Sequence, residues 1–185
     1  MSPSDDSGKL LGGILEGTYS VLQAHFHWPS EHLVNGIRYP LELDVVFTKD
    51  GVVDPLNTHK GLAVVGIFFE HGPAEEAFNE LAVLAQGQLL HPGTYFTSSR
   101  WATDFKGLMK RVWDTADFSH YQGSLTTPPC SQVVQWINFL TPLTVAPSQV
   151  EAFMKMKNKD GKCHVENYRP VQELNDRTIY YGTLN

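Results

Sequence analysis

Gln23-Ala24-His25-Phe26-His27-Trp28 alternates polar and apolar residues in the way of a β-strand with one buried face. Successive side chains of a strand point to opposite faces, so Gln23, His25 and His27 are expected to share one face. Two histidines set two apart on one face are typical of a transition-metal site, because imidazole binds zinc, copper, iron or nickel. The alternate residues, which are apolar, are expected to pack on the other face: Leu22, Ala24, Phe26 and Trp28.

A second alternating segment, residues 41–47, follows shortly along the chain. Its apolar positions are expected to face the core: Leu41, Leu43, Val45 and Phe47. Glu42, Asp44 and Val46 then share the opposite face. If the two strands are neighbours, Asp44 would complete a His-His-carboxylate set and leave a fourth tetrahedral position open for water, as in catalytic zinc sites. The alternative is that Glu42 and Asp44 only solvate an exposed face.

Composition limits the classes of protein that fit this chain. With 185 residues, 42% hydrophobic and 18% charged, the sequence predicts one globular domain with a buried core. The formal net charge of −6 argues against nucleic acid or an anionic membrane as a partner. The apolar runs are shorter than the roughly 20 residues of a transmembrane helix.

The remaining periodicity predicts a mostly β protein with short helices at its periphery. Five segments rich in valine, isoleucine, phenylalanine and tyrosine are expected as strands: residues 18–28, 39–48, 62–70, 132–139 and 178–181. Two segments show helical spacing of apolar residues: residues 74–84 and 147–156.

Six segments, in the same order along the chain, resemble the alpha-class carbonic anhydrases. They are Gln23-Ala24-His25-Phe26-His27-Trp28, Ser30-Glu31-His32, Tyr39-Pro40-Leu41-Glu42-Leu43, residues 61–67, residues 121–130 and Asn167-Tyr168-Arg169-Pro170. The resemblance implies a central, twisted, mainly antiparallel sheet with short peripheral helices. It covers residues 19–185, whereas residues 1–18 have no clear match, and the N-terminal part of the family domain is expected to be missing.

The resemblance also implies roles for matching residues. The two strand histidines match zinc ligands, and Asp44 stands where the family has a third histidine. Thr126 matches the residue that orients the attacking hydroxide, and Glu31 matches the acceptor of its proton. Gln23 and Glu42 match the residues that support the ligands from the second layer.

The substrate, carbon dioxide, would lie in an apolar pocket that Thr127 also lines. The residues at the matching positions are Val46, Val64, Leu125 and Trp136. For these four, ordinary core packing is the alternative when the residues are taken alone. His32 is expected to be a buried structural histidine.

The aspartate in the third ligand position changes the expected electrostatics. A carboxylate can bind zinc, but it offsets more of the metal charge than an imidazole does, so water at the site should be acidified less. Glu42 would then face a carboxylate in place of an N–H donor. Three outcomes are open: Glu42 is partly protonated, it turns away, or zinc is bound loosely.

Location and cysteine pairing are left open by the sequence. Residues 1–9 are polar and acidic and show no secretory signal. Cys130, after Pro128-Pro129, matches a position that forms a disulfide in secreted members of the family, which hints at an extracellular lineage. A bridge between Cys130 and Cys163 is an alternative without further support.

The leading hypothesis is a zinc-dependent carbonic anhydrase that hydrates carbon dioxide with reduced efficiency. The alternative is a carbonic anhydrase-related binding protein that keeps the fold without efficient metal chemistry. Uncovered sheet edges, left by the missing part, would also favour self-association unless residues 1–18 substitute for it.

Overall fold

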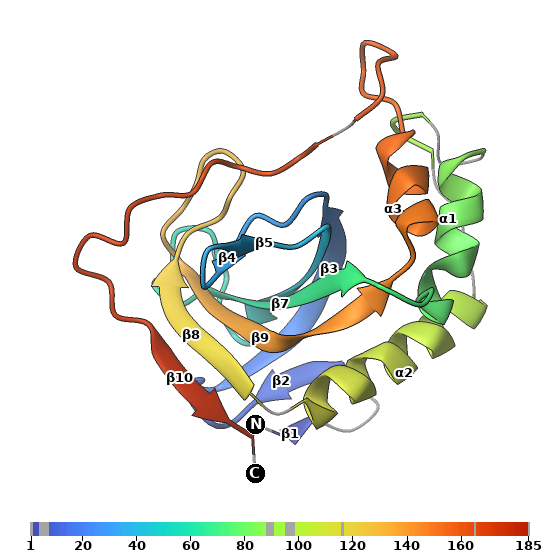
Figure 1. Ribbon diagram of the computed structural model, residues 1–185. Helices are drawn as coiled ribbons and strands as arrows, with labels where there is room; N and C mark the ends of the chain where they lie inside the picture. The colour runs from blue at the N-terminus through green and yellow to red at the C-terminus, as the bar shows by residue number, and fades with distance from the viewer. Residues whose placement is uncertain are drawn as a thin grey trace.

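An eight-stranded sheet forms the centre of the computed structural model, which describes residues 2–3, 8–87, 91–94, 99–115, 117–164 and 166–184. The strand order is β1-β2-β3-β6-β7-β9-β8-β10. Neighbours pair antiparallel except β7 and β9, which are parallel. Figure 1 shows that the sheet curls strongly and keeps one concave side. The expected mostly β, mainly antiparallel architecture is confirmed.

The sheet strands have these bounds: β1 Ser2–Pro3, β2 Lys9–Leu11, β3 Thr18–His27, β6 Leu41–Lys49, β7 Leu62–His71, β8 Asp117–Gly123, β9 Val134–Val145 and β10 Tyr180–Thr183. β4 Leu33–Val34 and β5 Ile37–Arg38 form a separate small hairpin. All five strands expected from the sequence exist, the last of them two residues later than expected. β8 was not predicted.

The side chains of β6 alternate between the two faces of the sheet as expected, but both faces are buried. Its odd-numbered apolar residues, Leu41, Leu43, Val45 and Phe47, belong to the main hydrophobic core. On the other face Glu42 is 0% and Asp44 1% exposed. The alternative in which these carboxylates solvate an open surface is therefore wrong. Glu42 and Asp44 are shielded from water on the concave side of the sheet, so they need partners within the protein.

A bulge alters the expected faces of β3. The pairing of β3 with β6 shifts register between Val21 and Gln23. A bulge inserts an extra residue and redirects its side chain. Leu22 was expected in the core, but it is 60% exposed and lines a cavity together with Gln23 and His25. The prediction for Leu22 was wrong because a strict two-residue period does not survive a bulge. Ala24 was also expected to pack and is exposed.

The helices gather along one side of the sheet (Figure 1). The two predicted helical segments are found as η1 Glu76–Phe78 with α1 Asn79–Ala85, and as α3 Pro147–Met154. Pro147 at the first position of α3 supplies the preset φ of a helix start. A third helix, α2 Ser99–Asp114, was not predicted, although Leu108 and Val112 on it are buried in the core.

Aromatic rings join the helices to the convex face of the sheet. Phe78 is 0% exposed, and its ring centroid lies 5.1 Å from that of Phe26 and 5.0 Å from that of Phe69. Phe153 of α3 stacks on Phe26 at 5.2 Å. Such pairs add to the free energy gained from apolar burial. Phe26 therefore ties the histidine strand to two helices.

A C-terminal strap, defined as residues 166–179, runs over the sheet from the region after α3 to β10 (Figure 1). Asn167 anchors it to the end of β3. The Asn167 side chain accepts from the Trp28 amide at 2.7 Å and donates to the Phe26 carbonyl at 2.9 Å. The strap therefore replaces a neighbouring strand at this end of β3.

The other end of the β3 edge is covered by β2, which pairs with residues 18–20. Of the N-terminal segment for which no match was expected, residues 1 and 4–7 lie outside the described residues.

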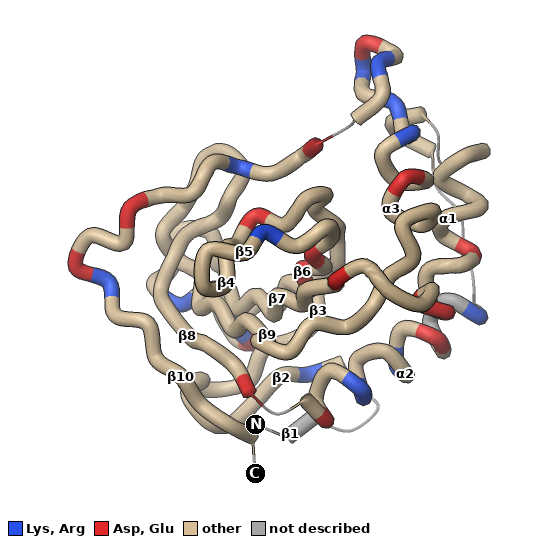
Figure 2. Tube along the Cα trace, in the orientation of Figure 1, with Lys and Arg blue, Asp and Glu red and all other residues tan. Residues whose placement is uncertain are grey.

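Figure 2 shows lysine and arginine distributed over many elements. Within the described ranges no helix has the length and apolar character needed to cross a membrane. Cys130 and Cys163 are free thiols, so the alternative of a bridge between them is wrong.

Replacing Phe78 tests the contact between helices and sheet. The Phe78→Ala variant should lower the free energy of unfolding by about 3–5 kcal/mol, because it leaves a cavity among three aromatic rings. Val83→Ala on neighbouring α1 is the matched control, since Val83 is 72% exposed and should change stability by less than about 0.5 kcal/mol. Urea denaturation of both variants measures the difference. Equal losses would contradict the assigned core.

Candidate metal centre

The pairing of β3 with β6 brings the predicted metal ligands together. His25 lies directly opposite Asp44, and His27 lies opposite Glu42. One ligand atom from each of His25, His27 and Asp44 falls within 4.8 Å of the other two. The sequence-based expectation that the strands are neighbours and that Asp44 faces the histidines agrees with this geometry.

The distances are close to those of a zinc site. His27 Nε2 lies 3.5 Å and His25 Nε2 3.9 Å from Asp44 Oδ2. Two atoms bound to one zinc ion at about 2.0–2.2 Å in a tetrahedral arrangement lie about 3.4 Å apart. The three groups therefore need only small movements to bind one ion.

Hydrogen-bond acceptors orient the two imidazoles so that Nε2 of each ring faces the metal centre. His25 Nδ1 donates to Gln23 Oε1 at 3.0 Å, and His27 Nδ1 donates to the Asn167 carbonyl at 2.8 Å. Both acceptors place the ring proton on Nδ1, so each Nε2 keeps its lone pair for a metal. Gln23 has the position expected of it. The role of Asn167 was not predicted, because a backbone carbonyl is present at every residue and the sequence does not mark the one used.

Several buried polar atoms of the centre have no hydrogen-bond partner among the described residues. They are His27 Nε2, Glu31 Oε2, Asp44 Oδ1 and Asp44 Oδ2. A buried carboxylate without donors is costly unless a cation compensates it. Together with two imidazole nitrogens, this donor set fits a zinc ion.

The pKa values of His25 and Asp44 are shifted in opposite senses, with opposite effects on metal binding. Burial, with a smaller contribution from the neighbouring His27, lowers the pKa of His25 to about 4. His25 is therefore neutral at physiological pH and can bind a metal without losing a proton. Burial, followed by the charges of Glu42 and Glu31, raises the pKa of Asp44 well above its ordinary value. Without a cation, Asp44 favours its protonated form.

Glu42 is held by groups other than the three metal ligands, but its carboxylate stays close enough to Asp44 to raise the pKa of that residue. Its Oε2 accepts from the backbone amides of Glu31 at 2.8 Å and His32 at 3.0 Å. Its Oε1 lies 2.6 Å from His32 Nδ1, and the same imidazole contacts Tyr121 Oη through Nε2. Burial alone would raise the pKa of Glu42, but His32 and these hydrogen bonds outweigh it and lower the pKa. Glu42 therefore positions Glu31 and His32.

A cavity of about 380 Å³ is lined by two of the three ligand residues, His25 and Asp44. It contains every residue expected at the substrate site: Val46, Val64, Leu125, Thr126, Thr127 and Trp136. Five lining residues were not predicted: Leu22, Thr48, Pro55, Leu56 and Leu62. Val46, Val64 and Trp136 belong to a buried apolar cluster separate from the main core, so packing and cavity lining occur together.

Glu31 does not form the expected hydrogen bond with Thr126. Glu31 Oε1 accepts from the Arg169 backbone amide at 2.6 Å. Its Oε2 lies 3.4 Å from His27 Nε2 and accepts no hydrogen bond within the described ranges. Glu31 therefore faces the metal centre, and the Arg169 amide is a further contact that the sequence did not reveal.

Comparisons with known proteins give a consistent result. The sequence profile of the family described as "Eukaryotic-type carbonic anhydrase" matches residues 2–183. The chain is similar to a Caenorhabditis elegans protein with the provisional name carbonic anhydrase 3, with 38% identity over 96% of this chain and 70% of the relative. It is also similar to human mitochondrial carbonic anhydrase 5A, with 33% identity over 95% of this chain and 60% of the relative. A third relative, carbonic anhydrase 7 of Mus musculus, is 32% identical over 95% of this chain and 70% of its own length.

Asp44→Asn tests the electrostatics of the centre in zinc-free protein. Unfolded aspartate ionises near pH 4, whereas folded Asp44 ionises only at higher pH, so the native carboxyl destabilises the fold increasingly as the pH rises above about 4. The variant should therefore gain stability relative to the native chain as the pH rises above about 4 in the presence of a chelator. Denaturation at several pH values measures this difference.

Zinc should make the native chain more stable than Asp44→Asn, the reverse of the trend expected without metal as the pH rises. At a zinc concentration of about 100 times the dissociation constant, the native chain should gain about 2.7 kcal/mol, and Asp44→Asn much less. Asp50→Asn is the control, because Asp50 is outside the centre and its pKa is lowered by hydrogen bonds from Lys9 and Ser20. Two results would contradict the assignment of Asp44 as a ligand. One is a stability difference between the native chain and Asp44→Asn that does not change with pH, and the other is equal stabilisation of these two proteins by zinc.

Proposed function

This chain belongs to the eukaryotic-type carbonic anhydrase family, and on that basis we propose that it binds zinc through His25, His27 and Asp44 and catalyses the reversible hydration of carbon dioxide to bicarbonate with reduced efficiency. One observation supports the proposal above the others. Buried ligand atoms of His27 and Asp44 that have no hydrogen-bond partner among the described residues lie close together, and Asp44 and His25 also line a mainly apolar cavity. This arrangement suits a cation beside a small nonpolar substrate.

The metal and the residues around it would divide the chemistry between them. Zinc, when bound, supplies a Lewis acid that brings the ionisation of water to about neutral pH and stabilises the developing negative charge of bicarbonate. Val46, Val64 and Leu125 hold carbon dioxide by apolar contact and exclude competing water. Trp136 is fixed by its indole N–H, which donates to the Ser124 carbonyl at 3.0 Å.

Proton handling is assigned to Thr126 and Glu31. Thr126 lies between the apolar wall and Glu31, since it lines both the cavity at the metal ligands and a second cavity that includes Glu31. A threonine hydroxyl donates one hydrogen bond and accepts others, so it can give its proton to a carboxylate while it orients the attacking oxygen. Glu31 Oε2 is free to accept that hydrogen bond once the side chain turns toward Thr126.

The reduced efficiency follows from the charge of Asp44. An anionic ligand offsets one positive charge of the cation that an imidazole would leave in place. The attacking water is then acidified less. If its pKa rises from about 7 to about 8, roughly a tenth of it is ionised at pH 7 in place of about half.

A second function is favoured by the orientation of Glu31. Its Oε2 lies 3.4 Å from His27 Nε2 and is not bonded to Thr126. A centre fixed in this state would hold a metal without an active proton acceptor. In that case the chain is a carbonic anhydrase-related binding protein.

The pH profile of carbon dioxide hydration separates the two functions. The native chain, with zinc measured on the same sample, should be more active at pH 9 than at pH 7. Asp44→His should shift the midpoint by about one unit toward neutral pH and raise the rate at pH 7 about fivefold. Stopped-flow assays with a pH indicator measure both effects. A folded, zinc-loaded native chain without activity at any pH would favour the binding protein.

Thr126→Val tests the assigned proton relay. The substitution keeps the shape of the side chain and removes its hydroxyl, so kcat/KM should fall by about 10²-fold or more. Thr127→Val is the matched control, because it removes a neighbouring hydroxyl from the same cavity wall. Zinc content should stay the same in both variants. Equal activity losses in the two would argue against a specific role for Thr126.

A further inference from the structure

A second cavity, lined in part by residues of the C-terminal strap, shares Thr126 with the cavity at the metal ligands. Its volume is about 440 Å³, compared with about 380 Å³ for the cavity at the metal ligands. Small-molecule sites in proteins have volumes of about 300–1,000 Å³. The proposed carbonic anhydrase chemistry places no substrate in this second space.

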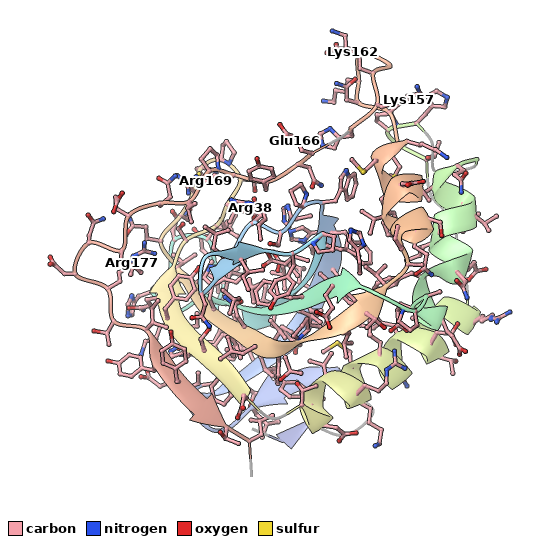
Figure 3. The ribbon with its side chains drawn as sticks, in the orientation of Figure 1. Arg38, Lys157, Lys162, Glu166, Arg169 and Arg177 are labelled. Atoms are coloured by element: carbon pink, nitrogen blue, oxygen red, sulfur yellow. The ribbon has the colours of Figure 1, made fainter. Side chains whose placement is uncertain are left out.

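Two arginines of the strap give this cavity a positive character in a chain of net charge −6. Arg169 and Arg177 line it, and Glu31 is the carboxylate among its lining residues. Figure 3 shows both arginines on the strap where it passes β8 and approaches β10. A guanidinium recognises a carboxylate through parallel hydrogen bonds.

The Arg177 side chain is held in place before any ligand binds. Its Nε donates to the Leu174 carbonyl at 3.0 Å, and its Nη2 donates to the Glu173 carbonyl at 2.6 Å. The guanidinium carbon lies 5.7 Å from the centre of the Tyr121 ring. Among the described residues Nη1 has no hydrogen-bond partner, so this donor is available to a ligand.

Asn138 adds a second polar group that has no partner. It lines the same cavity and is 4% exposed, and its Oδ1 accepts no hydrogen bond within the part of the chain that the structure describes. Gly66 beside it leaves room for this oxygen, because a Cβ at Gly66 would lie only 2.4 Å from Asn138 Oδ1. A buried acceptor of this kind is costly without a donor. This oxygen lies against Gly66 and is closed to water, so a ligand O–H or N–H group would reach it after a rotation of the Asn138 side chain.

The rest of the cavity wall is largely apolar. Leu33, Ile37 and Leu140 line it on one side, and Val171 and Leu174 of the strap line it on the other. Ile37 is 56% and Val171 57% exposed, so a ligand that covers them would bury apolar surface that now faces water.

We propose that the second cavity is a binding site for a small amphipathic carboxylate that also carries a hydrogen-bond donor. The carboxylate contacts Arg177, with Arg169 adding positive charge, and the apolar body lies against the leucine and valine wall. The donor reaches Asn138 Oδ1 once the Asn138 side chain rotates toward the cavity. An inorganic anion would use the arginines alone and would leave Asn138 and the apolar wall without a partner.

Isothermal titration with 4-hydroxybenzoate tests the site in the whole chain, after removal of zinc so that the metal cannot bind the probe. A dissociation constant of about 1 mM or lower is expected, which for a ligand of this size lies within ordinary ligand efficiency. Neutral 4-hydroxybenzamide should bind at least about tenfold more weakly, because it lacks the charge that Arg177 recognises. Benzoate, which lacks the donor for Asn138, should also bind more weakly.

Variants locate the binding within the molecule. Arg177→Gln should weaken 4-hydroxybenzoate at least about tenfold, whereas Lys162→Gln, which removes a positive charge from an exposed turn, should not. Val171→Trp places a large ring from an exposed strap position against the cavity and should weaken binding even if Arg177→Gln fails to fold. Asp44→Ala should leave the affinity unchanged.

Three results would overturn the proposal. They are no saturable binding of 4-hydroxybenzoate, equal affinity for the neutral amide, and an equal loss in Arg177→Gln and Lys162→Gln. Loss of binding in Asp44→Ala would place the probe at the metal ligands and would also overturn it. Because zinc content and hydration activity are measured separately, failure of this site leaves the proposed carbonic anhydrase function untouched.

Discussion

The register of β3 against β6 is the constraint on which the metal centre depends. It sets His25 opposite Asp44 and His27 opposite Glu42, on the face of the sheet away from the main core. A slip of one residue would send each of these side chains to the other face. The register is enforced from the core side, where Leu43 and Val45 of β6 are at most 1% exposed and Phe26 packs against Phe78 and Phe153. Apolar packing on one face therefore fixes the polar geometry on the other.

The two carboxylates on that polar face are not equivalent. Glu42 accepts two backbone hydrogen bonds and contacts His32, and these contacts keep its pKa low in spite of burial. Asp44 has no such donors, and burial raises its pKa. The negative charge that the fold already stabilises is thus on Glu42, whereas Asp44 is left to a proton or a cation. Binding of a cation at Asp44 and stability of the folded state are therefore linked.

Alternation in the sequence was sufficient to predict β3, β6, the core face of β6 and the approach of Asp44 to the two histidines. The resemblance to a family added Thr126, Glu31 and the apolar residues that line the same cavity. Other features depend on information that a residue pattern does not contain. The bulge that exposes Leu22 interrupts the two-residue period, and the burial of Glu42 depends on its hydrogen bonds with Glu31 and His32. The contacts of Asn167 and Arg169 with the centre use backbone atoms, which have no residue identity.

The C-terminal strap connects features that the sequence keeps apart. The Asn167 carbonyl orients His27, the Arg169 amide holds Glu31, and Arg177 faces the second cavity beside Tyr121. These three contacts lie within eleven consecutive residues that have no regular secondary structure. Asn167 fixes the first of them with its side chain as well as its backbone, so the strap cannot move at that end without breaking hydrogen bonds to β3. The orientation of a metal ligand and the shape of the second cavity are therefore set by one segment, whose position depends on the strand that carries the histidines.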